Sequence, residues 1–422
     1  MQSSSTVALI SVHSDPASET GSQNVYVRQI GEALSRLGWQ VDMFTRKTDT
    51  TQADIVQHNP NCRTIRLAAG EQQYVPRQKL IGYLPGFLKQ LLQFQRDNQI
   101  QYRLIHTNYW LSAWVGMELK KNQPLKHIHT YHSLGAVEYA YEPDIPNIAK
   151  TRLAIEKTCL ETADLTIATC PQQRDYLRQL VSDRGYVEIV SSGTDTKLFG
   201  SVSSTEARKK LGIKIDTFNV LYVGKLDRRR GVETLVKALS KSQLHSLADI
   251  RLTLVDDSRA GNPFGKKSIE QLAWDLGVDN IINFVSGLSR KELATYYAAA
   301  DVCVVPSYYN PSGMVAMEAM ASGTPVVAAN AGALKYVVQH EETGLLFPAQ
   351  NSFLLTRAIA RLITAPEMRS QLALSARERI EELFTWDSVA SQLSEFYSEQ
   401  IEQQNLELLN KSLYHSIRAI KA

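Results

Sequence analysis

Short apolar runs and amphipathic stretches alternate along the whole chain. In the first half, the β-branched and apolar runs predict strands, and the stretches between them have the spacing of helices with one apolar face. The predicted strands span residues 7–12, 40–45, 64–67, 104–107, 127–131, 165–168 and 187–190, and the predicted helices include 24–37, 110–121, 148–162 and 172–181. Strand and helix in alternation indicate βαβ units and a mainly parallel sheet.

The second half repeats the pattern. Strands are predicted at 220–223, 251–255, 281–284, 302–305 and 325–328, and helices at 233–240, 268–276, 290–299 and 313–322. The polar stretch 199–205 between the halves is a predicted hinge. We therefore expect an α/β protein with two facing, doubly wound, Rossmann-like domains at 1–200 and 201–384. The Glu-, Gln- and Leu-rich segment 385–422 is expected to be helical and either to pack back on the N-terminal domain or to contact a protein partner.

Composition removes several classes of function. Hydrophobic residues make up 44% and charged residues 21% of 422, an ordinary globular balance. The net charge of +3 gives no reason to expect nucleic-acid binding. No apolar run approaches the roughly 18 residues of a membrane span. The N-terminal MQSSST has no basic region, which is not typical of a signal peptide. We expect a cytoplasmic protein.

Four cysteines are scattered along the chain without a CxxC pair or a metal-ligand spacing: Cys62, Cys159, Cys170 and Cys303. They are interpreted as small buried hydrophobic residues in a reducing compartment. No metal site is predicted.

We look for candidate site residues where the predicted strands end, because doubly wound sheets bind ligands beyond the carboxyl ends of their strands. Gly21 precedes a helix N-terminus, where free N–H groups favour anions, although a simple strand-to-helix turn would look the same. His132 lies in the segment HTYHSLG after a strand. A lone histidine is more often structural, so by itself it is a weak signal.

Two segments of the second half are stronger. GKLDRRRG (224–231) places four cations between a strand and a helix, which favours a phosphate site over a solvated face. In PSYYNPSGMVAMEAMASGTP (306–325), a strand leads through a turn into an apolar helix that contains Glu318. A carboxylate in that position needs a partner, either a ribose diol or a structural cation.

Taken together, these segments resemble retaining glycosyltransferases of family four, in the branch that includes sucrose-phosphate synthase and its cyanobacterial relatives. The resemblance covers about residues 7–397. Its motifs are HSDP (13–16), GSQNVYVRQI (21–30), HSLG (132–135), TRLAIEK (151–157), GKLDRRRG (224–231), PSYYNPSGMVAMEAMASGTPVV (306–327), ETGLLF (342–347) and FTWDSVA (384–390). It implies the B-type glycosyltransferase fold.

The resemblance also implies the roles of the site residues. Hexosyl transfer with retention is expected from a nucleotide sugar, with UDP-glucose foremost, to a sugar or sugar phosphate, without metal or cofactor. The implied catalytic residues are His132, Lys225, Arg230 and Asn310. The donor would contact Gly21, Ser22, Gly224, Leu288, Gly313, Met314, Val315 and Glu318, and the acceptor would contact Gln23, Arg152 and Glu138.

Several of these positions depart from the family pattern. Asn310 stands in place of the first of two paired glutamates, Glu138 in place of a lysine, and Ser22 in place of a glycine. Lys225 and Arg230 invert the usual Arg–Lys order. An alternative hypothesis is therefore a catalytically degenerate relative that acts as a nucleotide-sugar-binding or protein-interaction subunit.

Overall fold

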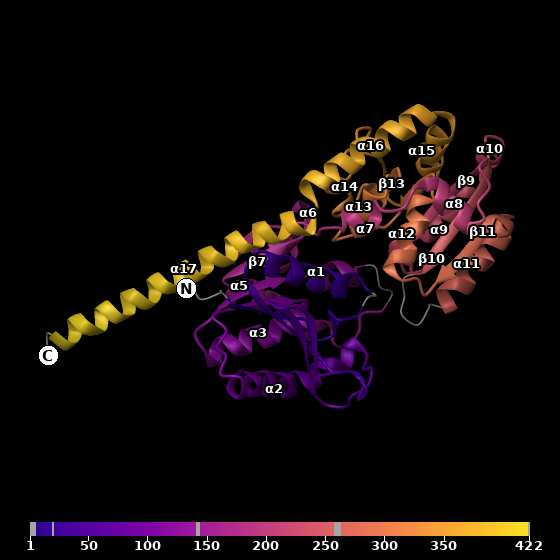
Figure 1. Cartoon of the computed structure of the whole chain (residues 1–422). Helices are drawn as coiled ribbons and strands as arrows, with labels where there is room; N and C mark the ends of the chain where they lie inside the picture. The colour runs from indigo at the N-terminus through magenta and orange to yellow at the C-terminus, as the bar shows by residue number, and fades with distance from the viewer. Residues whose placement is uncertain (1–5, 19–20, 141–143, 257–262, 421–422) are drawn as a thin grey trace.

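The computed structural model describes residues 6–18, 21–140, 144–256 and 263–420, except for the side chains of 263–264 and 411–420. Each half of the chain builds a lobe around its own sheet, and one long helix at the C-terminal end runs along the first lobe and beyond it (Figure 1). Two parallel-sheet α/β domains, the expected fold class, are thus confirmed.

The first lobe contains an eight-stranded sheet in the order β3-β4-β2-β1-β5-β6-β7-β8. Every neighbouring pair is parallel except β3 and β4. The strands are β1 (Thr6–Ile10), β2 (Gln40–Arg46), β3 (Ile55–Asn59), β4 (Cys62–Leu67), β5 (Leu104–Asn108), β6 (Lys126–Thr130), β7 (Leu165–Ala168) and β8 (Val187–Ile189). The antiparallel edge strand β3 was not predicted.

The second lobe contains a parallel six-stranded sheet in the order β11-β10-β9-β12-β13-β14. Its strands are β9 (Thr217–Val223), β10 (Asp249–Asp256), β11 (Ile282–Ser286), β12 (Val302–Val305), β13 (Val326–Ala329) and β14 (Leu345–Phe347). The three-residue strand β14 was also missed.

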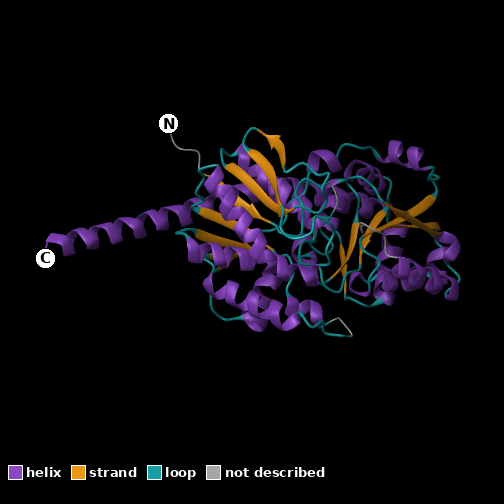
Figure 2. Cartoon of the chain, turned by 90° about the horizontal axis from the view of Figure 1, so that it is seen from below, coloured by secondary structure: helices purple, strands orange, loops and turns teal. Residues whose placement is uncertain are grey.

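Helices flank both groups of strands (Figure 2). Those of the first lobe are α1 (Ser22–Arg36), α2 (Leu84–Asp97), α3 (Trp110–Asn122), α4 (Gly135–Tyr139), α5 (Ala149–Thr162) and α6 (Pro171–Tyr176). The remainder are α7 (Thr196–Phe199), α8 (Ser204–Leu211), α9 (Val232–Leu239), α10 (Ser242–His245), α11 (Pro263–Asp275), α12 (Arg290–Ala298), α13 (Met314–Ala321), α14 (Leu334–Val337), α15 (Ser352–Thr364), α16 (Pro366–Leu383) and α17 (Trp386–Ile420).

Burial on both faces explains why the strands are apolar without alternation. Successive side chains of a strand point to opposite faces. In β1, Val7 and Leu9 belong to the core shared with α1 and α17, whereas Ala8 and Ile10 belong to the core under α2 and α3. Each sheet is therefore the middle layer of its lobe.

Helix α17 packs against α1 and the ends of β5 and β6. The Trp39 indole donates to Ser394 Oγ at 2.8 Å, and the Tyr397 ring is buried against Trp39 and His106. Further along, Leu406 and Leu409 are exposed. Within the described part of the chain, no helix combines the length and the hydropathy needed to cross a membrane.

Strand order reverses once in each sheet, and this fixes where ligands bind. In the first sheet the strand order reverses between β1 and β5. In the second sheet it reverses between β9 and β12. Loops diverge beyond the carboxyl ends of the strands at such a point and leave room for a ligand. The segments that follow β1, β5, β9 and β12 are therefore the candidate site.

Candidate active site

His132 follows β6 and is held in a strained backbone conformation. Its φ of 60° lies in the left-handed region, as does that of Tyr109 after β5, at 74°. Such outliers in residues with a Cβ cost about 1–3 kcal/mol and gather at functional sites. The ring is fixed from two sides, because its Nε2 lies 2.8 Å from Asn108 Oδ1 and Tyr26 meets it edge-on at 4.7 Å between centroids. The strain therefore serves to aim one imidazole.

The His132 imidazole is neutral at physiological pH. Burial lowers its pKa to about 3, because the surrounding protein disfavours the charged form. The nitrogen facing the amide oxygen of Asn108 must carry the single proton, which leaves Nδ1 as a hydrogen-bond acceptor. A neutral ring with a lone pair can accept a sugar hydroxyl and does not repel positive charge developing on a sugar carbon.

Gly21, Ser22 and Gln23 begin α1 beside this histidine. Gly21 is the N-cap with a φ of 92°, a conformation that favours glycine. Gln23 Nε2 donates to Ser11 Oγ at 3.2 Å and lies 3.5 Å from the carbonyl of Asn108. The helix N-terminus is thus connected to the segments that follow both β1 and β5.

In the second lobe, the loop 224–231 after β9 has a fixed shape. Asp227 accepts a hydrogen bond from the amide of Arg230 at 3.1 Å, and Tyr308 donates its amide to the carbonyl of Arg229 at 2.8 Å. A Cβ at Gly231 would lie 2.0 Å from the carbonyl oxygen of Pro306, so only glycine fits. The loop is therefore locked to the segment after β12.

Lys225 is exposed and Arg230 is half-buried at this locked loop. Among the described residues, no ion-pair partner lies within 4 Å of the Arg230 guanidinium. Gly224, between β9 and Lys225, has its amide bonded to the carbonyl of Val255 at 3.0 Å. Leu288 packs, partly buried, on the core of the same lobe. The loop thus presents two cations at the strand-order reversal.

Helix α13 begins directly after the second loop. Gly313 is its N-cap with a φ of 69°, and the amide of Gly313 donates to Asn310 Oδ1 at 2.9 Å. The buried Asn310 side chain therefore fixes the turn. The amides of Met314 and Val315 lie in the first turn and have no acceptor within the helix, which makes this end favourable for an anion.

Glu318, one turn further on, is buried and has two protein partners. Arg290 donates to its Oε1 at 2.9 Å and the Tyr297 hydroxyl to its Oε2 at 2.9 Å. The structural cation that the sequence left open is thus present. Arg290 begins α12 two residues after Leu288, so the pair lies close to a residue that is expected to contact the donor.

The two lobes touch around these loops. Thr169 Oγ1 donates to the carbonyl of Pro311 at 2.6 Å, and the amide of Gly332 donates to Gln172 Oε1 at 2.5 Å. Tyr309 of the second lobe is buried in a cluster with Tyr131, Leu134 and other residues of the first lobe. The segment after β12 is therefore a shared boundary of both lobes.

Arg152 and Glu138, the expected acceptor residues, pair with each other. Arg152 Nη1 lies 2.6 Å from Glu138 Oε2, and Arg152 Nε lies 2.7 Å from the fully buried Glu156. Glu138 Oε1 also lies 3.4 Å from Arg229 of the second lobe. Burial opposes ionisation of Glu138, but the charge of Arg152, its hydrogen bond and Arg229 together outweigh burial and lower the pKa of this carboxyl.

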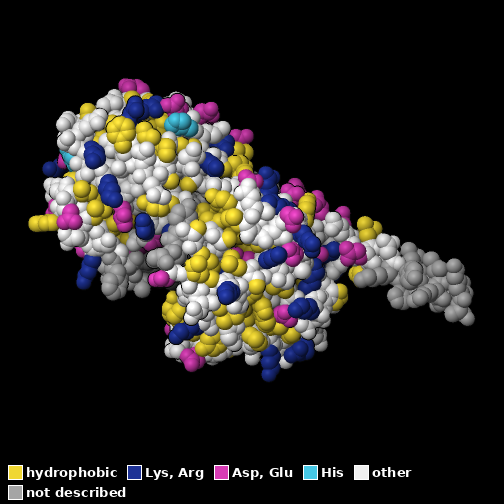
Figure 3. All heavy atoms as spheres, turned by 180° about the vertical axis from the view of Figure 1, so that it is seen from behind, with side chains coloured by type: hydrophobic (Ala, Val, Ile, Leu, Met, Phe, Trp, Pro, Cys, Tyr) yellow, Lys and Arg dark blue, Asp and Glu magenta, His cyan; other side chains and the backbone are white. Residues whose placement is uncertain are grey.

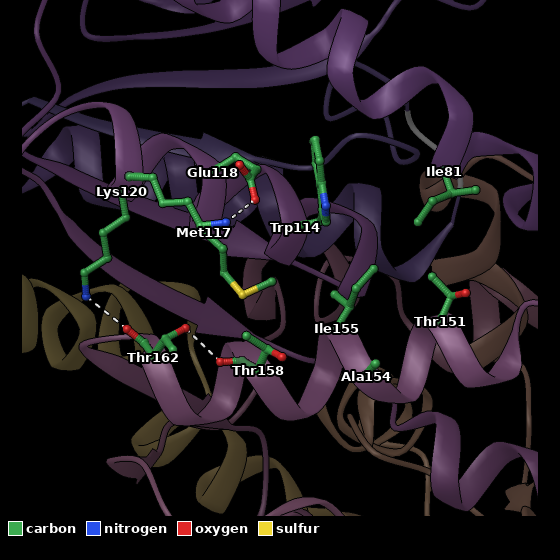
Figure 4. A pocket seen from close by; sticks show the side chains of 11 residues that line it. Ile81, Trp114, Met117, Glu118, Lys120, Thr151, Ala154, Ile155, Thr158 and Thr162 are labelled. Atoms are coloured by element: carbon green, nitrogen blue, oxygen red, sulfur yellow. Dashed lines mark hydrogen bonds and ion pairs between the residues drawn. The ribbon is translucent and has the colours of Figure 1, made fainter.

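A separate apolar cavity of about 610 Å³ lies between α3 and α5, away from the strand ends (Figure 4). Trp114, Met117 and Ile155 line it, with Lys120 and Lys121 at its edge. Polar side chains, among them Thr158 and Thr162, also line it, and Lys120 is already bonded to Thr162 and Asp164. Elsewhere on the surface, positive and negative side chains are interspersed, as Figure 3 shows for one face.

Another buried group lies in the core between β6 and α5. His127, His129 and Cys159 each offer a potential ligand atom within 4.8 Å of the others, a grouping that the sequence did not predict. The Thr107 hydroxyl already bonds both rings, at 2.7 and 2.8 Å. All four cysteines are free and buried, as expected.

Two parallel α/β lobes touch through the segments after β6 and β7 of one and after β9 and β12 of the other. With a cationic loop and a helix N-terminus in one lobe and a neutral histidine in the other, they define the class of B-type-fold glycosyltransferases. The chain belongs to the group 1 glycosyl transferases. Residues 203–379 match the family described as Glycosyl transferases group 1, and residues 21–193 match the Glycosyl transferase 4-like domain.

Relatives extend this similarity over nearly the whole chain. D-inositol 3-phosphate glycosyltransferase from Corynebacterium efficiens is 34% identical over 93% of this chain and 95% of that protein. A solved sucrose-phosphate synthase from Thermosynechococcus elongatus is 43% identical, with a TM-score of 0.85 over 94% of this chain and all of that one. Anabaena HepE with UDP and glucose, at 20% identity and a TM-score of 0.74 over 94% and 100%, shares the fold.

Three residues of the site were not predicted from the sequence. Asn108 orients His132, Arg290 pairs with Glu318, and Tyr309 joins the lobes. Asn108 had a signal, since it ends a strand at the reversal of strand order. Arg290 and Tyr309 had none, because their partners are distant in sequence.

Proposed function

We propose that the chain transfers a hexosyl group with retention from a nucleotide sugar, with UDP-glucose as the first donor to test, to a sugar or sugar-phosphate acceptor in the manner of sucrose-phosphate synthase. One observation carries the proposal: the loop 224–231 packs directly against the segment that leads into α13. Lys225, Arg230 and the first-turn amides of α13 therefore lie at the same reversal of strand order, between β9 and β12. This arrangement suits a diphosphate.

The remaining roles follow from the positions of the side chains. Glu318 would accept the ribose hydroxyls, and the base would lie near Leu288. His132 would accept a hydroxyl of the donor sugar through Nδ1. Gln23, on the first-lobe side, would face the acceptor. UDP-glucose complexes of a protein with the same fold support the choice of donor.

Transfer would occur on one face of the sugar. The bond from the anomeric carbon to the diphosphate oxygen breaks, and the acceptor oxygen bonds to the same face. The acceptor's proton passes to the departing phosphate oxygen. Lys225, Arg230 and the amides of Met314 and Val315 neutralise the charge that develops there, so the residues present suffice without a metal.

Incubation of the purified chain with UDP-glucose and a panel of sugars and sugar phosphates tests the proposal. We expect acceptor-dependent release of UDP and, by NMR, a product with the anomeric configuration of the donor. Absence of UDP release with every acceptor would contradict it. Calorimetry with UDP then separates the alternative of a nucleotide-sugar-binding subunit, for which binding without turnover is expected.

A further inference from the structure

We infer that the acceptor is an uncharged sugar or polyol rather than a phosphorylated one. The reason is that the carboxylate of Glu138 already bridges the two lobes at the acceptor side, where a phosphate of the acceptor would otherwise bind. This inference rests on the proposed function, since it specifies the acceptor of the same site. Its support is the position of one carboxylate between arginines of different lobes.

Both oxygens of Glu138 are engaged by cations. Oε2 accepts from Arg152 of α5 at 2.6 Å, and Oε1 lies 3.4 Å from the Nη1 atom of Arg229 in the loop 224–231. Arg152 belongs to the first lobe and Arg229 to the second. A bound phosphate would bridge two guanidinium groups in the same way. The side chain of Glu138 thus occupies the position that a phosphate of the acceptor would need.

Each of the three guanidinium nitrogens of Arg152 already donates to a protein acceptor. Nε donates to Glu156, Nη1 to Glu138, and Nη2 to Ser133 Oγ at 3.2 Å. The side chain is only 4% exposed, so it cannot turn outward to a ligand without leaving Glu156 buried and unpaired. Arg152, expected to contact the acceptor, is therefore committed within the protein.

The charges of the cluster also disfavour a phosphate. Asp227 lies 3.8 Å from Arg229, so the connected chain runs from Glu156 through Arg152, Glu138 and Arg229 to Asp227. Glu138 and Asp227 thus already flank Arg229, and a phosphate placed here would add a like charge beside these carboxylates. Like charges in a partly desolvated site repel.

Arg77 is a further cation near Arg152. Arg77 shares the ring of Tyr109 with Arg152, at 5.5 and 5.2 Å from its centroid. It is exposed, and an exposed guanidinium contributes little to an ion pair because water screens its charge. A neutral polyol suits this position, because its hydroxyls can donate hydrogen bonds to the carboxylate of Glu138. The Glu138 side chain is 23% exposed and can therefore be reached.

The test compares matched acceptors on matched variants. Fructose and myo-inositol are assayed against fructose 6-phosphate and inositol 3-phosphate, with UDP-glucose as donor, in the wild type, Glu138→Gln, Glu138→Lys and Glu402→Lys. Glu402 is exposed on α17, so the last variant controls for the change of charge. We expect the wild type and the control to favour the neutral acceptors at least tenfold in kcat/KM. Glu138→Lys should shift that ratio toward the phosphorylated acceptors by at least tenfold.

A binding measurement separates this inference from the proposed function. Calorimetric titration of fructose 6-phosphate in the presence of UDP should give at least tenfold weaker binding to the wild type than to Glu138→Lys, whether or not transfer occurs. A wild type that prefers phosphorylated acceptors, or equal binding by the two proteins, overturns the inference. If Glu138→Lys does not fold, Glu138→Gln decides by the same measurements, with at least a threefold gain expected.

Discussion

Arg290 Nη2 donates to Glu318 Oε1 at 2.9 Å, and this pair holds the carboxylate that we propose for the donor ribose. The Glu318 side chain is 5% exposed, and a carboxylate buried to this degree requires hydrogen-bonding partners. The Tyr297 hydroxyl engages the second oxygen. The two protein donors preorganise Glu318, and each of its oxygens has a further lone pair for a ribose hydroxyl.

Glu318→Gln should weaken UDP binding by roughly 10- to 100-fold, because a hydrogen bond to a charged group contributes about 1.5–3 kcal/mol. Calorimetry with UDP measures the effect. Glu367→Gln, at an exposed site on α16, is the control and should bind UDP as the wild type does. If Glu318→Gln binds equally well while remaining folded, Glu318 is a structural residue and the ribose lies elsewhere.

Arg230→Ala should lower kcat/KM for UDP-glucose by roughly 100- to 1000-fold, the typical effect of removing one donor to charge that develops in the transition state. Arg228 in the same loop is exposed, and Arg228→Ala provides a control of equal charge. The comparison uses initial rates of UDP release. A similar loss in both variants would mean that general positive charge, rather than one positioned guanidinium, drives the reaction.

Tyr309 tests the contact between the lobes. Tyr309→Ala should lower the free energy of unfolding by about 3–5 kcal/mol, because it empties a buried aromatic position in the cluster with Tyr131 and Leu134. Tyr309→Phe keeps the ring and should change stability by less than about 1.5 kcal/mol. Urea unfolding measures both. An alanine variant as stable as the phenylalanine variant would show that the interlobe packing contributes little.

Much of the fold was predictable because its central strands are buried on both faces. Strands such as β12 and β13 are continuous apolar runs, and amphipathic helices lie between the strands. The missed elements lack that signal. Strand β3 is a partly exposed edge strand with the sequence IVQHN, and β14 has three residues. Their strand conformation depends on neighbours that local sequence does not reveal.

Site residues at strand ends could be predicted from the sequence, whereas pairings between residues distant in the sequence could not. The sequence predicted His132 and the loop 224–231 at strand-to-helix junctions, and in the structure they follow β6 and β9. The partners of His132 and Glu318 are 24 and 28 residues away, and nothing local indicates such pairings. Glu138 was expected to contact the acceptor, but its bridge to Arg229 follows only from how the two lobes dock.

Buried histidines make stability depend on pH. Burial lowers the pKa of His106 and His127 to about 3, from the roughly 6.5 of an unfolded chain. Between these values the unfolded chain binds protons that the folded chain does not, so stability rises with pH across this window and is fully present above about 6.5. Burial shifts the pKa of His129 and His132 in the same direction.

Each of these histidines should contribute up to about 1.4 kcal/mol per pH unit between pH 3 and 6.5. Urea unfolding at half-unit steps from pH 8 to 5 should therefore give constant stability above pH 7 and a steep decline below 6.5. His106→Gln removes one such group and should reduce the slope by about 1.4 kcal/mol per pH unit. The region above pH 7 serves as the internal control, since the imidazoles are neutral there in both states. An equal dependence of stability on pH in both proteins would mean that His106 is protonated in the folded state. Both ring nitrogens would then have to donate, to the Tyr397 and Thr130 hydroxyls.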